Sequence, residues 1–192
     1  MEAAKTLEAL RQVQLKYGKM GFGVPFGSYF GADDKNVTMN IFSVGQGGLT
    51  LGQKDWYVNP DKATSDIREA FKKHIVRMFE LFGFNHADAQ RKMQSVFRFE
   101  TELALVSKSN VELRDPQANY NKMTLAQFEE TYPNIPLKAY TQAEGIDTKY
   151  IQELIVGQPA FFAGLDKLLP LLTADDLRAI MEWDLIQGSA SY

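Results

Sequence analysis

Residues 61–107, DKATSDIREAFKKHIVRMFELFGFNHADAQRKMQSVFRFETELALVS, decide the fold class. Apolar side chains recur at spacings of three and four over residues 61–82, which is typical of an amphipathic helix, and Gly83 interrupts that pattern. Asn85 is a good N-cap for a second helix, which we expect to continue to about Ser107. Two consecutive long helices, each with an apolar face, favour a mainly α domain.

Helical periodicity also appears on both sides of this stretch. The other segments that show it are residues 3–17, 124–130, 137–144, 158–171 and 174–187. Gly18 should end the first of these, and Thr124 and Thr173 should cap two of the later ones. Pro170 should bend or end the helix over 158–171 because proline cannot continue the hydrogen-bond ladder.

The period changes to two near the N-terminus. Residues 24–30 alternate in side-chain type, residues 37–41 do the same, and turn-forming residues 31–36 separate them. This pattern predicts a β-hairpin, with Pro25 suited to an edge or to the start of a strand. Residues 45–48, GQGG, are expected to form a loop.

Length and composition fit one globular domain. The chain has 192 residues, of which 45% are hydrophobic and 23% charged, and its net charge is −3. This mild acidity gives no basic surface for nucleic acid, and no apolar run is long enough for a membrane span, so neither partner is expected. Because no Ser-, Gly- or Pro-rich linker divides residues 1–192, we predict a single multi-helix domain, mainly α, with one small β-hairpin near the N-terminus.

The sequence lacks the residue types or the spacings that most catalytic and ligand-binding motifs require. Zero cysteines exclude disulfides, thiolate metal sites and thiol nucleophiles. The glycine-rich stretches 21–27 and 45–48 lack the context or the Gly-Lys-Ser/Thr ending of a phosphate loop. His74 and His86 lie on different predicted helices and in no His-Glu-x-x-His motif, and no Gly-x-Ser-x-Gly elbow is present. We therefore predict no catalytic, cofactor-binding or metal-ligating residue in this chain.

Glu100 is the most informative carboxylate. It continues an apolar helical face, where a charge without a partner would be costly. The nearest suitable partner in the sequence is Arg114, and we predict a buried or half-buried Glu100–Arg114 pair that holds an irregular segment on the helix. A structural role is favoured over a catalytic one because no second acid or base is evident nearby. Asp33-Asp34 and Asp175-Asp176 are interpreted as turn and helix-N-terminal residues.

Four stretches in a fixed order carry a resemblance. They are FGADDKN (residues 30–36), GLTLGQKDWY (48–57), RDPQANYNKMTL (114–125) and LRAIMEWDLIQ (177–187). Together they resemble the neprilysin and endothelin-converting-enzyme family of zinc metallopeptidases. That family shows an Asp-Asp/Ser-Lys-Asn turn, then Gly-Leu-Pro-x-x-Asp-Tyr-Tyr, Arg-x-Asp-Pro…Tyr-Asn-x-Met-Thr-Leu and Leu-x-x-x-Met-x-Trp.

The chain departs from the family pattern at a few places. Thr50-Leu51-Gly52 stands where the family often has Gly-Leu-Pro, and Trp56 replaces a usual tyrosine. The family's animal members carry cysteines in this region, whereas this chain has none. The last two departures fit a bacterial relative.

The resemblance implies an interior segment of the N-terminal lid domain of such a metallopeptidase. The family's His-Glu-x-x-His motif and its downstream zinc-binding glutamate are expected beyond Tyr192, and the arginine that holds a substrate's C-terminal carboxylate is expected before Met1. No catalytic or zinc residue is therefore carried over: the parent uses zinc, and this chain alone should be inactive. The implied role is a helical domain that caps the active site and limits substrates to oligopeptides.

The same resemblance implies partners and a location. The partners are the catalytic domain of the same polypeptide and the parent's peptide substrates, and we expect exposed apolar surface to favour self-association of the isolated chain. The parent is expected outside the cytoplasm, as a secreted, periplasmic or membrane-tethered protein, with a cytoplasmic location as the alternative. Tyr120, Asn121 and Trp56 are candidates to face the substrate cavity, with structural roles as the alternative. The competing hypothesis is a free-standing helical binding or scaffold module.

Overall fold

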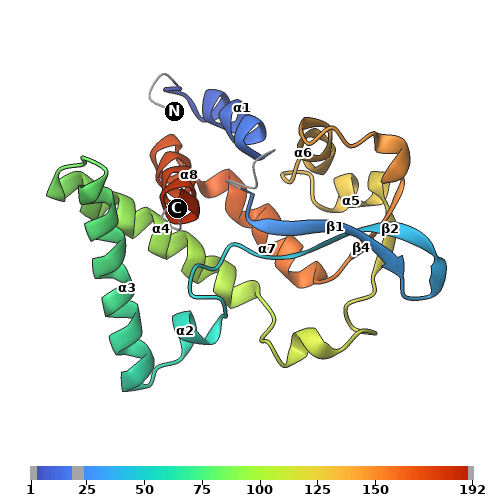
Figure 1. Cartoon of the computed structure of the whole chain (residues 1–192), viewed down its shortest axis with the longest axis horizontal. Coiled ribbons are helices and arrows are strands. Elements are labelled where there is room, and N and C mark those ends of the chain that lie inside the picture. The colour runs from blue at the N-terminus through green and yellow to red at the C-terminus, as the bar shows by residue number, and fades with distance from the viewer. Residues whose placement is uncertain (1–3, 19–23, 190–192) are drawn as a thin grey trace. The chain divides into compact units, whose positions relative to one another are not determined.

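The structure is a computed structural model that describes residues 4–18 and 24–189 (Figure 1). The chain divides into two compact units, and each is described by itself. Unit 1 comprises Met1–Gly23, Leu49–Leu105 and Leu172–Tyr192, and unit 2 comprises Val24–Gly48 and Val106–Leu171. In the described residues helices dominate and strands are confined to one small sheet, which confirms the predicted mainly α fold class.

Unit 1 is built on two long helices, α3 (Lys62–Leu81) and α4 (His86–Val106), as the periodicity predicted. The Asp61 carboxylate caps α3 by accepting a hydrogen bond from the Thr64 backbone N–H at 2.9 Å. The Asn85 side chain caps α4 in the same way through the Asp88 backbone N–H at 2.9 Å. Gly83, with φ of +95°, makes the tight turn between the two helices.

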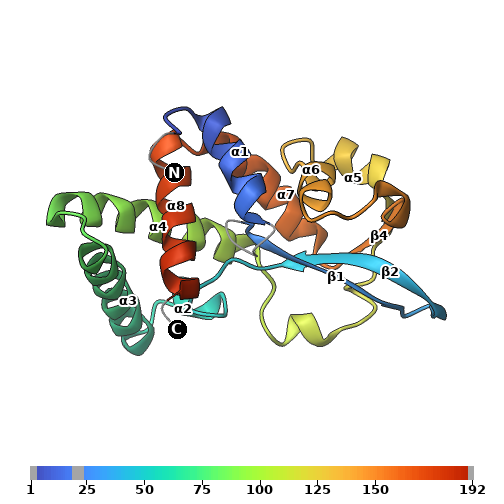
Figure 2. The ribbon, with the colours of Figure 1, turned by 45° about the horizontal axis from the view of Figure 1, so that its top comes forward.

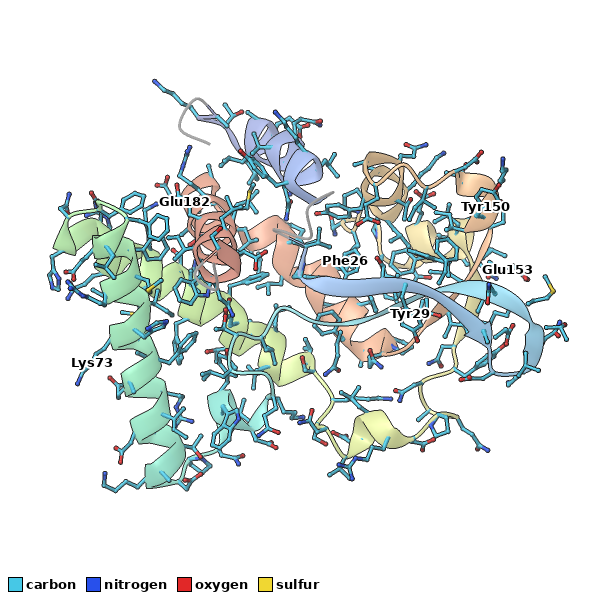
Figure 3. The ribbon with its side chains drawn as sticks, in the orientation of Figure 1. Phe26, Tyr29, Lys73, Tyr150, Glu153 and Glu182 are labelled. Carbon is cyan, nitrogen blue, oxygen red and sulfur yellow. The ribbon has the colours of Figure 1, made fainter. Side chains whose placement is uncertain are left out.

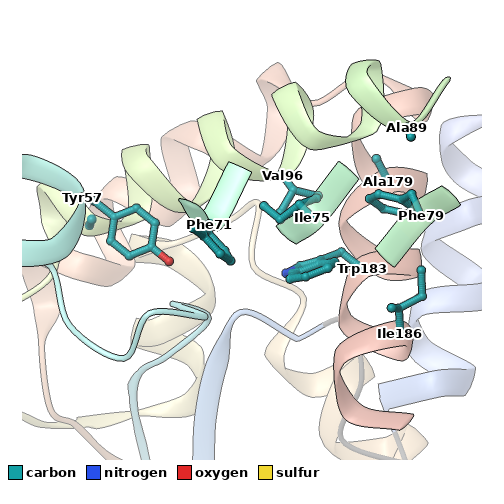
Figure 4. Packing of buried hydrophobic residues seen from close by; sticks show 10 residues of the cluster. Tyr57, Phe71, Ile75, Phe79, Ala89, Val96, Ala179, Trp183 and Ile186 are labelled. Carbon is teal, nitrogen blue, oxygen red and sulfur yellow. The ribbon is translucent and has the colours of Figure 1, made fainter. Parts of the chain in front are cut away.

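The main core of unit 1 joins α3 and α4 to α8 (Ala174–Ser189) and to the short helix α2 (Asp55–Val58), which was not predicted. The buried cluster consists of Tyr57, Phe71, Ile75, Phe79, Ala89, Val96, Ala104, Ala179, Trp183 and Ile186 (Figure 4). The Trp183 ring centroid lies 6.1 Å from the ring centroids of both Phe71 and Phe79. Trp183 therefore fixes α8 against α3.

The first helix, α1 (Leu7–Gly18), lies beside α8 (Figures 1 and 2). Leu10 of α1 belongs to one buried cluster with Leu177 and Met181 of α8. Helix α1 ends at Gly18 as predicted but begins at Leu7 rather than near residue 3. The Thr6 hydroxyl accepts a hydrogen bond from the Ala9 backbone N–H at 3.2 Å, so Thr6 caps the helix and sets its start.

Unit 2 contains the sheet, in the order β1-β2-β4-β3. Its strands are β1 (Phe26–Asp33), β2 (Asn36–Gln46), β3 (Lys122–Thr124) and β4 (Glu153–Val156). The predicted hairpin is the antiparallel β1–β2 pair, and β2 runs parallel to β4, which pairs antiparallel with β3. The loop prediction for residues 45–48 is wrong at Gly45 and Gln46, which belong to β2. The short β3 and β4 were missed because three or four residues show no recognisable period.

The rest of unit 2 contains three short helices and three 3₁₀ turns. They are α5 (Leu125–Thr131), α6 (Leu137–Ala143) and α7 (Pro159–Leu168), with 3₁₀ turns η1 (Glu112–Arg114), η2 (Thr148–Tyr150) and η3 (Leu169–Leu171). Thr124 caps α5 in a complete capping box with Gln127, and α7 ends just before Pro170, both as predicted. In the described ranges no helix combines the length and the apolar character that a membrane span requires.

Candidate functional site

Glu100, the carboxylate singled out from the sequence, lies on α4 in unit 1 and is only 4% exposed. Its Oε1 lies 2.6 Å from the Thr50 hydroxyl oxygen. Its Oε2 accepts hydrogen bonds from the Tyr57 hydroxyl and, at 3.4 Å, from the Thr50 backbone N–H. Arg114 lies in η1 of unit 2, so the Glu100–Arg114 pair stays a prediction.

Thr50 connects Glu100 to α8. The indole N–H of Trp183 donates a hydrogen bond to the Thr50 hydroxyl oxygen at 3.0 Å, and Oε1 of Gln187 lies 3.1 Å from the same oxygen. The rings of Tyr57 and Trp183 are parts of one apolar core (Figure 4). We call Thr50, Tyr57, Glu100, Trp183 and Gln187 the Glu100 cluster. It joins α2, α4, α8 and the segment before α2 at one buried carboxyl group.

The environment of the cluster changes how Glu100 titrates. Burial raises the pKa of Glu100 from 4.5 to about 7, because desolvation of the carboxylate outweighs the hydrogen bonds that it accepts from Thr50 and Tyr57. The same burial and the adjacent Glu100 raise the pKa of Tyr57 well above its usual value, so Tyr57 stays a donor. Glu100 is therefore a buried group that exchanges a proton near neutral pH.

The stability of unit 1 should fall as the pH rises from about 4.5 to about 7. A carboxyl group whose pKa is raised by folding contributes stability that is fully present below the unfolded pKa and is lost as the pH rises through the folded pKa. The difference between these two pKa values changes the free energy of unfolding by on the order of 3 kcal/mol. Denaturant unfolding of the wild type and of Glu100→Gln, followed by circular dichroism across this range, measures the effect. Equal pH slopes in the two proteins would contradict it.

A second polar cluster holds the hairpin turn in unit 2. The Oδ1 atom of the buried Asp33 accepts hydrogen bonds from the Lys35 backbone N–H and from the Tyr120 hydroxyl, both at 2.9 Å. Lys122 Nζ lies 3.7 Å from Asp33 Oδ2 and 2.9 Å from Glu153 Oε2, and Glu153 is labelled in Figure 3. The hydrogen bond from Lys35 is the main cause that lowers the pKa of Asp33. Asp33 therefore ties the turn to the segment that enters β3, besides forming the turn.

Asp33→Ala and Tyr120→Phe should each destabilise unit 2, and the double variant should lose less than the sum of the two. Both single changes remove the same hydrogen bond, so their effects overlap. Tyr29→Phe is the matched control, because the Tyr29 ring is 64% exposed on β1 (Figure 3). Denaturant midpoints of the four variants provide the measurement. Strict additivity would show that Asp33 and Tyr120 do not interact.

The two histidines lie apart from any ligand set. His86 Nδ1 lies 2.7 Å from Glu80 Oε1 at an exposed position, and the His74 ring packs 5.9 Å from the Trp183 ring. Within residues 4–18 and 24–189, no group of three or more His, Cys, Asp or Glu side chains could hold a metal ion. The described residues therefore do not fit the zinc that the family resemblance implies, and we derive no hydrolytic step from them.

Gly45 and Gln46 of the glycine-rich stretch 45–48 belong to β2, and Gln46 links this strand to Gln158 and Lys108. The Gln46 backbone N–H donates to Gln158 Oε1 at 2.7 Å, and the Gln46 side chain bonds both the N–H and the C=O of Lys108. A Cβ atom on Gly45 would lie 3.2 Å from that same Gln158 oxygen, so glycine makes room for it. Residues 21–23 of the other glycine-rich stretch, 21–27, lie outside the described residues.

Asp176 lies in the first turn of α8 and joins this helix to α4. Its backbone N–H donates to the Thr173 hydroxyl at 3.1 Å, which confirms the predicted cap, and its Oδ1 accepts a hydrogen bond from Arg98 at 2.6 Å. A cavity of about 570 Å³ between α4 and α8 is lined by Asp175, Arg98 and other charged side chains. Because Arg98 pairs with Asp176, and Lys92 of the same lining pairs with Glu182, these cations already have protein partners.

Residues from the stretches that carry the family resemblance contact one another. Asp33 binds Tyr120 in unit 2, and Thr50 binds Trp183 in unit 1. Two of the suggested cavity-facing residues also have structural contacts: Asn121 Nδ2 donates to the Val156 carbonyl at 3.0 Å, and Trp56 packs against the core of unit 1. Whether Tyr120, Asn121 or Trp56 faces a substrate stays a prediction.

The partners of Glu100 in unit 1 were missed from the sequence. Thr50 lies 50 positions before Glu100, and Tyr57 lies 43 positions before it, which no helical or strand period connects. The available signal was the motif over residues 48–57, which contains both Thr50 and Tyr57.

The comparison with known families agrees with the motifs. The family model described as Peptidase family M13 matches residues 2–192. The chain belongs to peptidase family M13. The match is to the N-terminal part of that family, which confirms the resemblance drawn from the motifs.

Several M13 relatives are similar to this chain over most of its length. Human neprilysin is 25% identical over 203 residues, which cover 96% of this chain and 26% of neprilysin. Rat endothelin-converting enzyme 1 is 25% identical over 170 residues, covering 87% of this chain and 22% of that enzyme. The chain therefore spans about a quarter of the length of these curated relatives.

Solved M13 structures have the same fold. The zinc metalloprotease Zmp1 of Mycobacterium tuberculosis, in complex with an inhibitor, matches with a TM-score of 0.89 at 25% identity, over 98% of this chain and 29% of Zmp1. PepO of Lactobacillus rhamnosis HN001 matches with a TM-score of 0.73 at 22% identity. The second likeness supports the fold alone.

Proposed function

We propose that this M13 segment belongs to the helical lid domain of a longer, neprilysin-like zinc metalloendopeptidase, where it caps the active site and limits substrates to oligopeptides. The observation that carries the proposal is the match of residues 2–192 to the M13 family model. The likeness to Zmp1, a zinc metalloprotease of which this chain covers 29%, supports it. In this proposal residues 1–192 are one part of a single lid domain, although they fold as two compact units.

The chemistry of the parent is assigned to polypeptide outside these residues. The zinc site would lie there, since the described residues hold no ligand set for it. This chain would contribute by excluding bulk water and bulky substrates from the active site. Structures of Zmp1 include an open state and a partial open state, and we infer a comparable opening in the parent of this chain.

The proposed partners are the catalytic domain of the same polypeptide and the peptide that it cleaves. Exposed apolar side chains on the hairpin, Tyr29, Val37 and Met39, support a docking role because such surface is usually covered by a partner. In the isolated chain we expect this surface to favour self-association. The family likeness also favours a parent outside the cytoplasm, which fractionation of the source cells would test.

A chimera in which this chain replaces the matching part of Zmp1 tests the proposal. We expect the chimera to cleave a short fluorogenic peptide and to leave the same sequence uncut within a folded protein, whereas the 192-residue chain alone cleaves neither. Equal cleavage of the peptide and the folded protein would overturn the size-limiting role. Stoichiometric zinc and chelator-sensitive cleavage by the chain alone would overturn the non-catalytic role.

A further inference from the structure

The hydrogen bonds around Thr50 depend on the proton of Glu100. Thr50 has one hydroxyl hydrogen, but its oxygen lies 2.6 Å from Glu100 Oε1 and 3.1 Å from Gln187 Oε1. Trp183 already donates to this oxygen and needs no hydrogen from it. If Glu100 is ionised, both neighbouring oxygens are acceptors and Thr50 can donate its hydrogen to only one of them. If Glu100 is protonated, it donates to Thr50 and Thr50 donates to Gln187, so all the groups are satisfied.

Two arrangements of the same groups follow. With Glu100 protonated, the hydrogen bonds run outward from Glu100 through Thr50 to Gln187. With Glu100 ionised, Thr50 donates to Glu100, and the Gln187 amide must rotate so that its NH₂ group donates to Thr50. Gln187 is exposed, so this chain of hydrogen bonds connects the buried carboxyl group to solvent.

The cluster holds one segment of the chain. Thr50 binds Glu100 through both its hydroxyl and its backbone N–H, and the Leu51 backbone N–H donates to the Tyr57 hydroxyl at 3.0 Å. Leu49 is the first residue after the chain leaves unit 2, and Gly52, with φ of +82°, makes a turn in this segment. The Glu100 carboxyl group therefore holds this segment directly through Thr50 and, through the Tyr57 hydroxyl, also at Leu51.

We propose that the Glu100 cluster is a proton-dependent switch that holds Leu49–Val58 on α4 and α8 when Glu100 is protonated and loosens this segment when Glu100 is ionised. The ionised form places a charge among the neutral cluster residues in an apolar core, and local opening hydrates it. Since burial raises the pKa of Glu100 to about 7, the change falls near neutral pH.

Other titratable groups face the core from the packed elements. Tyr57 on α2 is the titratable side chain in contact with Glu100. On α3, His74 packs on Trp183, Lys72 lies over the Phe97 ring, and Arg68 binds the carbonyls of Trp56 and Asn59. On α8, Glu182 pairs with Lys92 of α4, and Asp184 follows Trp183 in sequence. Among the described residues of unit 1, none of these cations is hydrogen-bonded or ion-paired to Glu100.

The titration of Glu100 in the 192-residue chain is the first test. Carbon NMR of glutamate-labelled protein should show one carboxyl group that titrates near pH 7, above the ordinary glutamate value of 4.5, and is missing in Glu100→Gln. Glu102, which is exposed on the same helix, is the matched control, and Glu102→Gln should leave this signal in place. A Glu100 that titrates at the ordinary glutamate value would overturn the switch.

Hydrogen exchange of the backbone amides of residues 49–58 is the second test. In the wild type, protection should fall about tenfold from pH 6 to about pH 8, after correction for the intrinsic exchange rate. In Glu100→Gln it should stay high at both pH values, because the glutamine NH₂ group can donate to Thr50 as the protonated acid does. The same loss of protection in Glu100→Gln would overturn the proposal. If that variant does not fold, the NMR titration of Glu100 in the wild type still tests the proposal.

Two further variants separate the switch from its alternatives. Thr50→Val removes the hydroxyl group and should loosen residues 49–58 at every pH, whereas Thr50→Ser should behave as the wild type. Arg114→Gln should leave the titration of Glu100 unchanged. If Arg114 is instead the partner of Glu100, the carboxyl group should titrate below the ordinary glutamate value and Arg114→Gln should raise its midpoint, which would overturn the switch.

Discussion

Replacing Trp183 with alanine should destabilise unit 1 by about 3–5 kcal/mol, the usual cost of truncating a buried aromatic side chain. Trp183 is 3% exposed, and its ring packs against Phe71 and Phe79 of α3. The change leaves a cavity where α3 and α8 meet, and it also removes the indole N–H that binds Thr50. Denaturant unfolding followed by circular dichroism, with hydrogen exchange to assign the loss to unit 1, measures the effect.

Two other substitutions show which part of Trp183 matters. Trp183→Phe keeps an aromatic ring but loses the N–H group, so it should cost less than alanine and should still weaken the protection of residues 49–58. Trp56→Ala removes a tryptophan that is only partly buried against the same core, and it should cost clearly less than Trp183→Ala. A Trp183→Ala protein within about 1 kcal/mol of the wild type would show that this core can relax around the cavity.

Replacing Gly164 with alanine should destabilise unit 2 by up to about 2 kcal/mol. An added Cβ atom on this residue of α7 would lie 2.5–2.8 Å from the side-chain atoms of Val106. Overpacking of this kind costs about 1–3 kcal/mol. It outweighs the gain of about 1 kcal/mol that alanine brings over glycine in a helix interior.

The destabilisation should become smaller when Val106 is made smaller. In a Val106→Ala background, Gly164→Ala no longer meets the valine Cγ atoms but still meets the Cβ atom of residue 106 at 2.8 Å, so it should stay destabilising by less than in the wild type. Unfolding of the wild type, both single variants and the double variant gives the coupling energy. A Gly164→Ala change that is equally destabilising in both backgrounds would place the cause in the helix backbone.

The helices of this chain could be predicted because their signals are local. The apolar face of α3, with Phe71, Ile75 and Phe79, follows the three-to-four spacing, and the caps at Asn85, Thr124 and Thr173 lie within three residues of the groups that they bind. The β1–β2 hairpin was found for the same reason, because its strands are adjacent in sequence. The family motifs indicated membership in peptidase family M13, which hydrophobic periodicity alone could not indicate.

The strand β4, the position of α2 and the surroundings of Glu100 depended on contacts between distant parts of the chain. The sequence placed Glu100 on an apolar face, but Thr50 and Trp183, whose hydrogen bond spans 133 positions, came together only when α4 and α8 packed. The β2–β4 pairing joins Phe42 to Leu154 in the same way. A helix repeats its contacts every few residues and so leaves a periodic pattern, whereas one hydrogen bond between distant segments leaves no pattern in a single sequence.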